Sequence, residues 1–128
     1  MIGPIEGEQA IARIMGLSVE EARATLEEWY GAAGAEEVLR IGRIWERDVL
    51  TRRERSFVAV AVLASVGALS RLPIHVRGAL HHGATREEVE EVLLTVMGYA
   101  GHGLGTSALA VAREVLDAAE GEARAGGS

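Results

Sequence analysis

Three histidines and one arginine occur in the eight-residue stretch from His75 to His82, within the segment LPIHVRGALHHG. An imidazole transfers protons near neutral pH, and a guanidinium binds a carboxylate through two parallel hydrogen bonds. His75 is therefore the candidate proton donor, and Arg77 is the candidate carboxylate-binding residue. His82 follows His75 by seven residues, about two helical turns, so both rings project from nearly the same face of a helix. His82 is accordingly the candidate second acid–base group.

Each of these residues also has a structural interpretation. His75 is alternatively a hydrogen-bonded core histidine, and Arg77 alternatively forms a salt bridge to Glu87, Glu88, Glu90 or a partner subunit. On a helix, Arg77 points about 200° away from His75, so either one of them is structural or the pocket lies at a subunit interface. We expect a shared pocket. His81 is expected to be a solvated residue at the helix end, with substrate contact as the alternative.

The segment that carries these residues is predicted to be a helical hairpin over residues 72–101. Pro73 suits a first helical position, and Gly83 suits a helix end. Thr85 and Glu88 form a Thr-x-x-Glu capping box that starts the second helix. The candidate residues therefore lie on one short helix, the first of the hairpin.

Helical periodicity extends over the rest of the chain, which predicts an all-α fold, a bundle of about six helices in a single domain of residues 1–128. Further helices are expected at 8–16, 18–30, 35–47, 57–69 and 106–119, and Ser18 with Glu21 forms a capping box for one of them. The run 57–69 is so apolar on all sides that we expect a buried central helix. The glycine-rich residues 101–105 are expected to connect two helices, and residues 120–128 to form a flexible tail.

The composition excludes several kinds of chemistry. The chain contains no cysteine and no lysine, which removes thiolate catalysis, cysteine-ligated metals and Schiff bases. A net charge of −6 argues against binding to nucleic acid. No His-Glu-x-x-His pattern is present, so we expect no metal site. The absence of a long apolar stretch and of a secretory leader favours a soluble cytoplasmic protein without a membrane segment.

The same apolar helices also predict self-association. One chain of 128 residues has little surface with which to cover both 57–69 and 89–96 on every side. We therefore expect a homo-oligomer in which subunit contacts cover the remainder, with a monomeric bundle as the alternative.

The run LPIHVRGALHHGATREEVEEVLL, followed by YAG, resembles the signature of the carboxymuconolactone decarboxylase family, within the alkylhydroperoxidase-like superfamily. GRIWERDVLTRRERSFVAVAVLASVGAL is similar to the preceding helices of that family, so the resemblance covers about residues 39–118. It implies an all-helical domain assembled as a trimer or hexamer. It also implies a cofactor-free lyase that removes carbon dioxide from 4-carboxymuconolactone, a small carboxylated lactone of aromatic catabolism.

The chain lacks the groups of the peroxidase branch of that superfamily, which has a glutamate, a Cys-x-x-Cys pair and a histidine. Counting back from His75 places Ala68 and Arg71 at the two cysteine positions and Ser56 at the glutamate position. Thiol peroxidase activity is therefore excluded on chemical grounds.

The chain also departs from the decarboxylase pattern. His81 and His82 replace two asparagines that are common in the family, and His102 stands where relatives tend to carry an apolar residue and a proline. His102 is expected either to close over a pocket or to lie in solvent. Trp45 and Tyr99 are expected mainly in the core, with the wall of the substrate pocket as their functional alternative.

Three functions are consistent with these observations. The first is a cofactor-independent decarboxylase that acts on a small carboxylated lactone. The second is a divergent family member that catalyses an isomerisation or cyclisation in specialised metabolism, with His75 and His82 as the acid–base pair. The third is a non-catalytic oligomer that binds a small acid.

Overall fold

The computed structural model describes the backbone of residues 4–126 and the side chains of residues 8–126. Every regular element in this range is a helix, which confirms the all-α prediction. The chain divides into two compact units, residues 1–52 and residues 53–128, and each is described by itself. That residues 1–128 act as a single domain stays a prediction.

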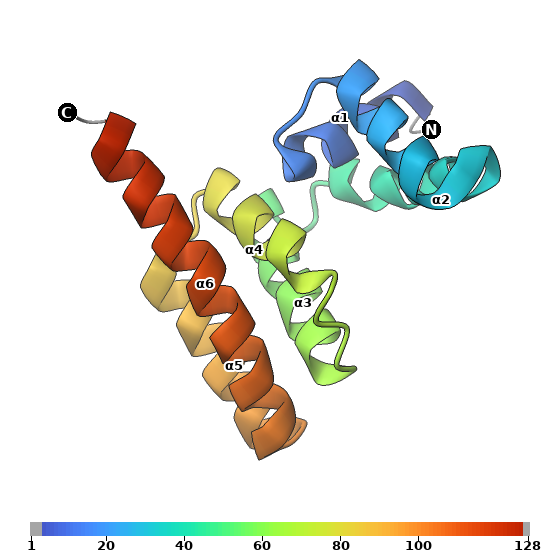
Figure 1. The fold of residues 1–128 in the computed structure, drawn as a ribbon. Coiled ribbons are helices and arrows are strands. Elements are labelled where there is room, and N and C mark those ends of the chain that lie inside the picture. Colours follow the sequence, from blue (N-terminus) through green and yellow to red (C-terminus); the bar gives the residue numbers. More distant parts are fainter. Residues whose placement is uncertain (1–3, 127–128) are drawn as a thin grey trace. The chain divides into compact units, whose positions relative to one another are not determined.

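The first unit consists of α1 (Pro4–Met15), α2 (Val19–Ile41) and the 3-10 helix η1 (Gly42–Glu46), shown in blue to green in Figure 1. The predicted capping box is confirmed, because Ser18 accepts from the backbone of Glu21 and the Glu21 carboxylate accepts from the backbone of Ser18. Gly31 interrupts α2 with φ 73° and ψ 174°, so the expected break near residue 30 is a kink rather than a loop. The positive φ explains why glycine occupies this position.

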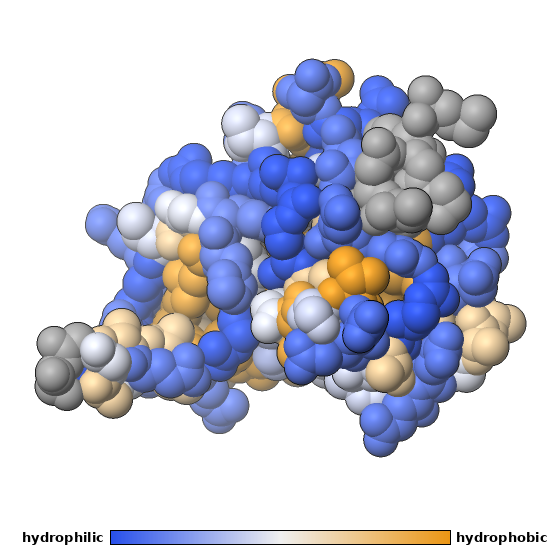
Figure 2. Space-filling model, turned by 90° about the horizontal axis from the view of Figure 1, so that it is seen from above, coloured by the Kyte–Doolittle hydropathy of each residue, from blue (hydrophilic) through white to orange (hydrophobic). Residues whose placement is uncertain are grey.

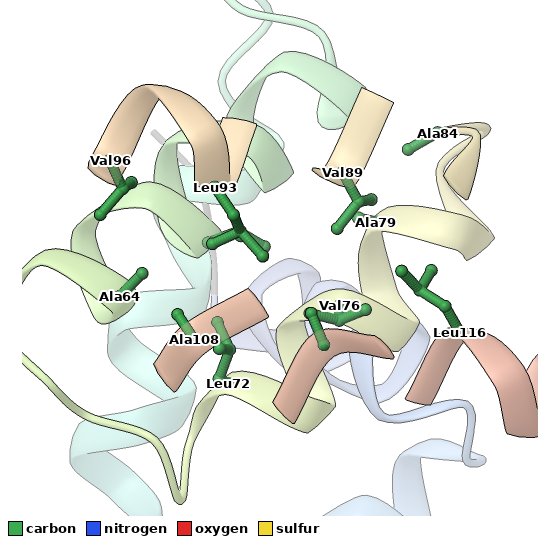
Figure 3. Close-up of a cluster of buried hydrophobic side chains, with 12 residues drawn as sticks. Ala64, Leu72, Val76, Ala79, Ala84, Val89, Leu93, Val96, Ala108 and Leu116 are labelled. Carbon is green, nitrogen blue, oxygen red and sulfur yellow. The ribbon is translucent and has the colours of Figure 1, made fainter. Parts of the chain in front are cut away.

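The second unit contains α3 (Arg52–Ser65), α4 (Leu72–His81), α5 (Arg86–Tyr99) and α6 (His102–Gly126). The predicted hairpin is confirmed: α4 and α5 are joined by a short turn, and α6 packs against both (Figure 1). Thr85 and Glu88 form the predicted capping box at the start of α5. All four helices contribute buried apolar side chains to one core, among them Ala64, Leu72, Leu93 and Leu116 (Figure 3).

The glycine-rich residues 101–105 were expected to be a connection, and this prediction is wrong. α6 begins at His102, so Gly103 and Gly105 belong to the start of this helix, and only Gly101 of the run lies outside it. Gly105 is buried there, and a Cβ added to it would lie 2.5 Å from Met97 Cβ and 2.6 Å from Met97 Cα. Glycine is needed at this position because α5 and α6 approach each other too closely for a side chain. α6 also continues to Gly126, seven residues beyond its expected end at 119.

The helix expected at 57–69 as a buried central element differs from the prediction in two ways. α3 runs from Arg52 to Ser65, and it is buried in the chain on one side only, through Ser56, Val60 and Ala64. Its other side exposes valines: Val58 is 52% exposed and Val62 is 54% exposed. Hydrophobicity alone does not distinguish a helix covered by its own chain from one that has an uncovered apolar side.

Polar residues dominate the face of the molecule shown in Figure 2, and apolar residues appear on it in small patches. Among the helices of residues 4–126, none has the length and apolar character required to cross a membrane.

Candidate functional site

α4 carries three of the predicted site residues, with a fourth, His82, at its C-cap, and His75 lies in the first half of the helix. His75 is partly buried. Burial lowers the pKa of the His75 imidazole, because the charged ring loses hydration, and the positive charge of Arg71 lowers this pKa further. Arg71 is the N-cap residue of α4, four residues before His75 and hence on the same side of the helix. The cation that lowers the pKa of His75 is therefore Arg71, which composition and spacing alone did not single out.

Arg77 lies in a different environment from His75. Its Nη1 is 3.3 Å from Glu122 Oε2 on α6, so it forms an ion pair across two helices of the second unit. The glutamates proposed as structural partners, Glu87, Glu88 and Glu90, instead pair with other arginines or face solvent. A salt bridge was foreseen for Arg77, but its partner was not.

Arg77, His81 and Glu122 line an open cleft of about 260 Å³ between α4 and α6, together with Leu80 and Ala119. His81 is exposed at the last position of α4. A cation and an imidazole one helical turn apart form a cleft that suits an anion, provided that the Glu122 carboxylate moves aside. The structure thus brings Arg77 together with His81 and separates it from His75.

His82, the C-cap residue of α4, is turned toward α3. Its Nδ1 lies 2.8 Å from the hydroxyl oxygen of Ser56, which is only 1% exposed. The other ring nitrogen, Nε2, is also shielded from solvent, although the residue as a whole is partly exposed. Two helical turns separate His82 from His75, a rise of about 10 Å. A single small substrate therefore has difficulty in contacting both rings.

The remaining candidates lie elsewhere. The expectation that Tyr99 lies mainly in the core is wrong: Tyr99 is 93% exposed at the end of α5, where it lines an open apolar groove of about 370 Å³. The other residues of this groove are Phe57, Val58, Ala61, Ser65, Val92, Thr95 and Val96. His102 is exposed at the first position of α6. Trp45 is buried on η1, in the first unit, in agreement with its interpretation as a core residue.

Sequence reasoning did not select three residues that contact or influence the candidates, namely Ser56, Arg71 and Glu122. Counting back from His75 places Ser56 and Arg71 at peroxidase positions. There they served only to show that a glutamate and a cysteine are missing, and their own side chains were not considered. Glu122 lies in the segment expected to be a flexible tail. Among residues 8–126, no group of three or more histidine or acidic side chains is arranged to hold a metal ion.

The fold and the histidine-bearing hairpin agree with the comparisons with known proteins. A sequence model of the Carboxymuconolactone decarboxylase family matches residues 38–114, which is more than half of the chain. The chain belongs to this family. The match includes η1 and the helices α3, α4 and α5, with the first half of α6.

Two curated relatives are decarboxylases. The chain is 36% identical over 75 residues to a 4-carboxymuconolactone decarboxylase of Acinetobacter baylyi, an alignment that covers 59% of this chain and 56% of the relative. It is 29% identical over 76 residues to a nitrosuccinic acid decarboxylase of Metarhizium robertsii, with 59% of this chain and 53% of the relative covered. The chain thus spans about half the length of the curated relatives that it matches.

Proposed function

We propose that the chain is a cofactor-independent decarboxylase that acts on a small carboxylated lactone such as 4-carboxymuconolactone. The observation that carries the proposal is the partly buried His75, an acid–base group with the cation Arg71 on the same side of α4. Two decarboxylases among the relatives support the reaction type. The absence of cysteine excludes a thiol peroxidase.

In this reaction the protein must deliver a proton and orient the substrate carboxylate. The bond between the carboxylate carbon and the lactone breaks, its electron pair enters the conjugated carbonyl system, and carbon dioxide leaves. A proton must then be added to carbon, and we assign its delivery to the imidazolium of His75, which solvent reprotonates afterwards. A cation beside the substrate carboxylate orients it, and both Arg71 and Arg77 are candidates for this role.

The substrate pocket is proposed to be completed by a second copy of the chain. Arg77 and His81 share one cleft, whereas His75 lies on another side of α4, and Tyr99 lines a separate groove. One small substrate cannot contact both sides of α4 in a single chain. A neighbouring subunit that approaches the helix must therefore supply the missing contacts. A homo-oligomer, a trimer or a hexamer, meets this requirement. It would also cover the exposed valines of α3.

The alternative function is an isomerisation or cyclisation with His75 and His82 as an acid–base pair. The separation of the two rings disfavours it. That reaction requires both rings to reach neighbouring atoms of one substrate, and two turns of helix stand between them. The non-catalytic alternative requires that replacement of His75 leave the function of the protein intact.

The first experiment is an assay of the purified protein with freshly generated 4-carboxymuconolactone, in which release of carbon dioxide and formation of the enol-lactone are followed. Nitrosuccinic acid serves as the second substrate, because one relative is named for it. We expect turnover of the lactone, and we expect His75→Gln to reduce kcat at least about 100-fold, the usual contribution of a general acid. His102→Gln, at an exposed position, is the matched control. Turnover that survives in His75→Gln would contradict the assigned role, and a well-folded oligomer that turns over neither acid would contradict the reaction.

A further inference from the structure

The contact between Ser56 and His82 is unusual among the helical hydroxyl groups of this chain. A serine or threonine inside a helix commonly donates its hydroxyl proton to the carbonyl three or four residues earlier. Ser65 donates to Ala61 in this way at 2.6 Å, and Thr95 donates to Glu91 at 3.0 Å. Ser56 makes no such bond within residues 8–126, and its hydroxyl lies instead 2.8 Å from His82 Nδ1.

The direction of this hydrogen bond follows from the burial of Ser56. A hydroxyl carries one proton, and a buried donor that finds no acceptor is disfavoured on the order of tenfold or more. Ser56 is 1% exposed, so water is not available to accept this proton. His82 Nδ1 is the acceptor at hydrogen-bond distance, and it accepts only when it carries no proton. The imidazole of His82 is then neutral, with its proton on Nε2.

We propose that Ser56 is a positioning residue that fixes the ring of His82 as the neutral Nε2–H tautomer, so that His82 serves as a hydrogen-bond donor and not as a proton acceptor. The tautomer is a property of the folded chain. Its catalytic use rests on the proposed function: the Nε2–H group donates to an oxygen on which negative charge develops as carbon dioxide leaves. Since about 10 Å of helix separates His82 from His75 of the same chain, the proton comes from His75 of a second copy at the shared pocket.

The surroundings of the ring suit a donor of this kind. Nε2 is shielded from bulk solvent, and a hydrogen bond in such an environment is stronger than the same bond in water. The residue as a whole remains partly exposed. A fixed tautomer also removes the need to reorient the ring when charge develops.

The test is a nitrogen-15 NMR measurement of the His82 ring in the full-length protein at pH 7.5, which needs no substrate. We expect a pyridine-type signal for Nδ1 and a pyrrole-type signal for Nε2. In Ser56→Ala both signals should shift toward the averaged values of a tautomer mixture. Ser65→Ala is the matched control, because it removes a hydroxyl from the same helix without touching His82, and it should leave both signals in place. Ser56→Thr, which keeps the hydroxyl, should retain the wild-type pattern.

A protonated Nδ1 in the wild type, or a tautomer that is unchanged in Ser56→Ala, would overturn the proposal. Kinetics then separate it from the proposed function. We expect Ser56→Ala to lower kcat for 4-carboxymuconolactone about tenfold with a smaller change in KM, and to have no further effect in a His82→Ala background. A Ser56-dependent tautomer in a protein that turns over no substrate would uphold the positioning by Ser56 and overturn the decarboxylase function instead.

Discussion

Arg77 Nη1 and Glu122 Oε2 lie 3.3 Å apart and join α4 to α6 near the carboxyl end of the chain. Both side chains are substantially exposed, at 40% for Arg77 and 65% for Glu122. An ion pair of this kind contributes only about 0–1 kcal/mol to stability, because water screens the charges. The geometry therefore leaves Arg77 able to exchange one carboxylate partner for another at little cost.

The first prediction concerns this exchange. If Arg77 binds the substrate carboxylate, Glu122→Gln removes its competitor and lowers KM about two- to fivefold, whereas Arg77→Gln raises KM tenfold or more. Steady-state kinetics with 4-carboxymuconolactone measure both changes. Glu120→Gln, on the same helix but paired with Arg86, is the control that leaves Arg77 untouched. Equal kinetics in Glu122→Gln and Arg77→Gln would show that the pair is only structural.

The second prediction concerns the close approach of α5 and α6 at Gly105. A methyl group at this position meets Met97 backbone and Cβ atoms at 2.5–2.9 Å, so the helices must separate. We expect Gly105→Ala to destabilise the protein by about 1–3 kcal/mol, the usual cost of overpacking, as measured by urea denaturation. Gly103→Ala is the control, because a Cβ there meets nothing within 4 Å. The higher helix propensity of alanine should make Gly103→Ala neutral or stabilising by up to about 1 kcal/mol.

Gly105 also shows why the sequence predicted some elements and not others. Local signals were sufficient where a side chain caps its own helix, as Ser18 and Thr85 do, and the start of α5 was predicted on that basis. A run of glycines is locally a turn signal. Gly103 and Gly105 instead belong to the start of α6, where Gly105 lies against Met97 of α5. Helix propensity does not account for such a contact between different helices.

The candidate site, like the fold, could be predicted only where the signal lies within one helix. Spacing on a helix correctly separated Arg77 from His75, but it did not identify partners on other helices. Ser56 on α3 and Glu122 on α6 contact His82 and Arg77 through packing of the second unit, at separations of 26 and 45 residues. Such contacts follow from tertiary structure, and a single sequence carries no local sign of them.

The third prediction concerns pH. Burial and Arg71 lower the pKa of His75 in the folded chain, whereas the unfolded chain titrates near the ordinary value of about 6.5. Between these two values the unfolded state binds more protons, so stability is greatest above about pH 6.5 and falls as the pH decreases toward the folded pKa. Urea denaturation at pH 7.5 and at pH 5.5 should show a smaller loss of stability in His75→Asn than in the wild type. His102→Asn, at an exposed position, should behave as the wild type does, and an identical pH dependence in all three proteins would contradict the prediction.

The fourth prediction concerns self-association through the apolar surface of α3 and the groove that this helix forms with α5. Ser65 and Thr95, which line the groove, donate their hydroxyl protons to carbonyls of their own helices, so the groove offers mainly apolar atoms. Val62, 54% exposed on α3, adds to the apolar surface of this helix. A homo-oligomer that buries this surface would have to bury the charge introduced by Val62→Arg, which costs several kcal/mol.

Light scattering coupled to size-exclusion chromatography provides the measurement. We expect a trimer or hexamer for the wild type and a shift to smaller species for Val62→Arg. Val49→Arg is the matched control, since Val49 is 79% exposed and lies in the first unit, not on α3. A wild-type monomer would contradict the homo-oligomer, and an unchanged oligomer in Val62→Arg would place the interface on another surface. Because the proposed pocket needs a second copy, Val62→Arg should also lose decarboxylase activity in proportion to its loss of oligomer, while Val49→Arg keeps both.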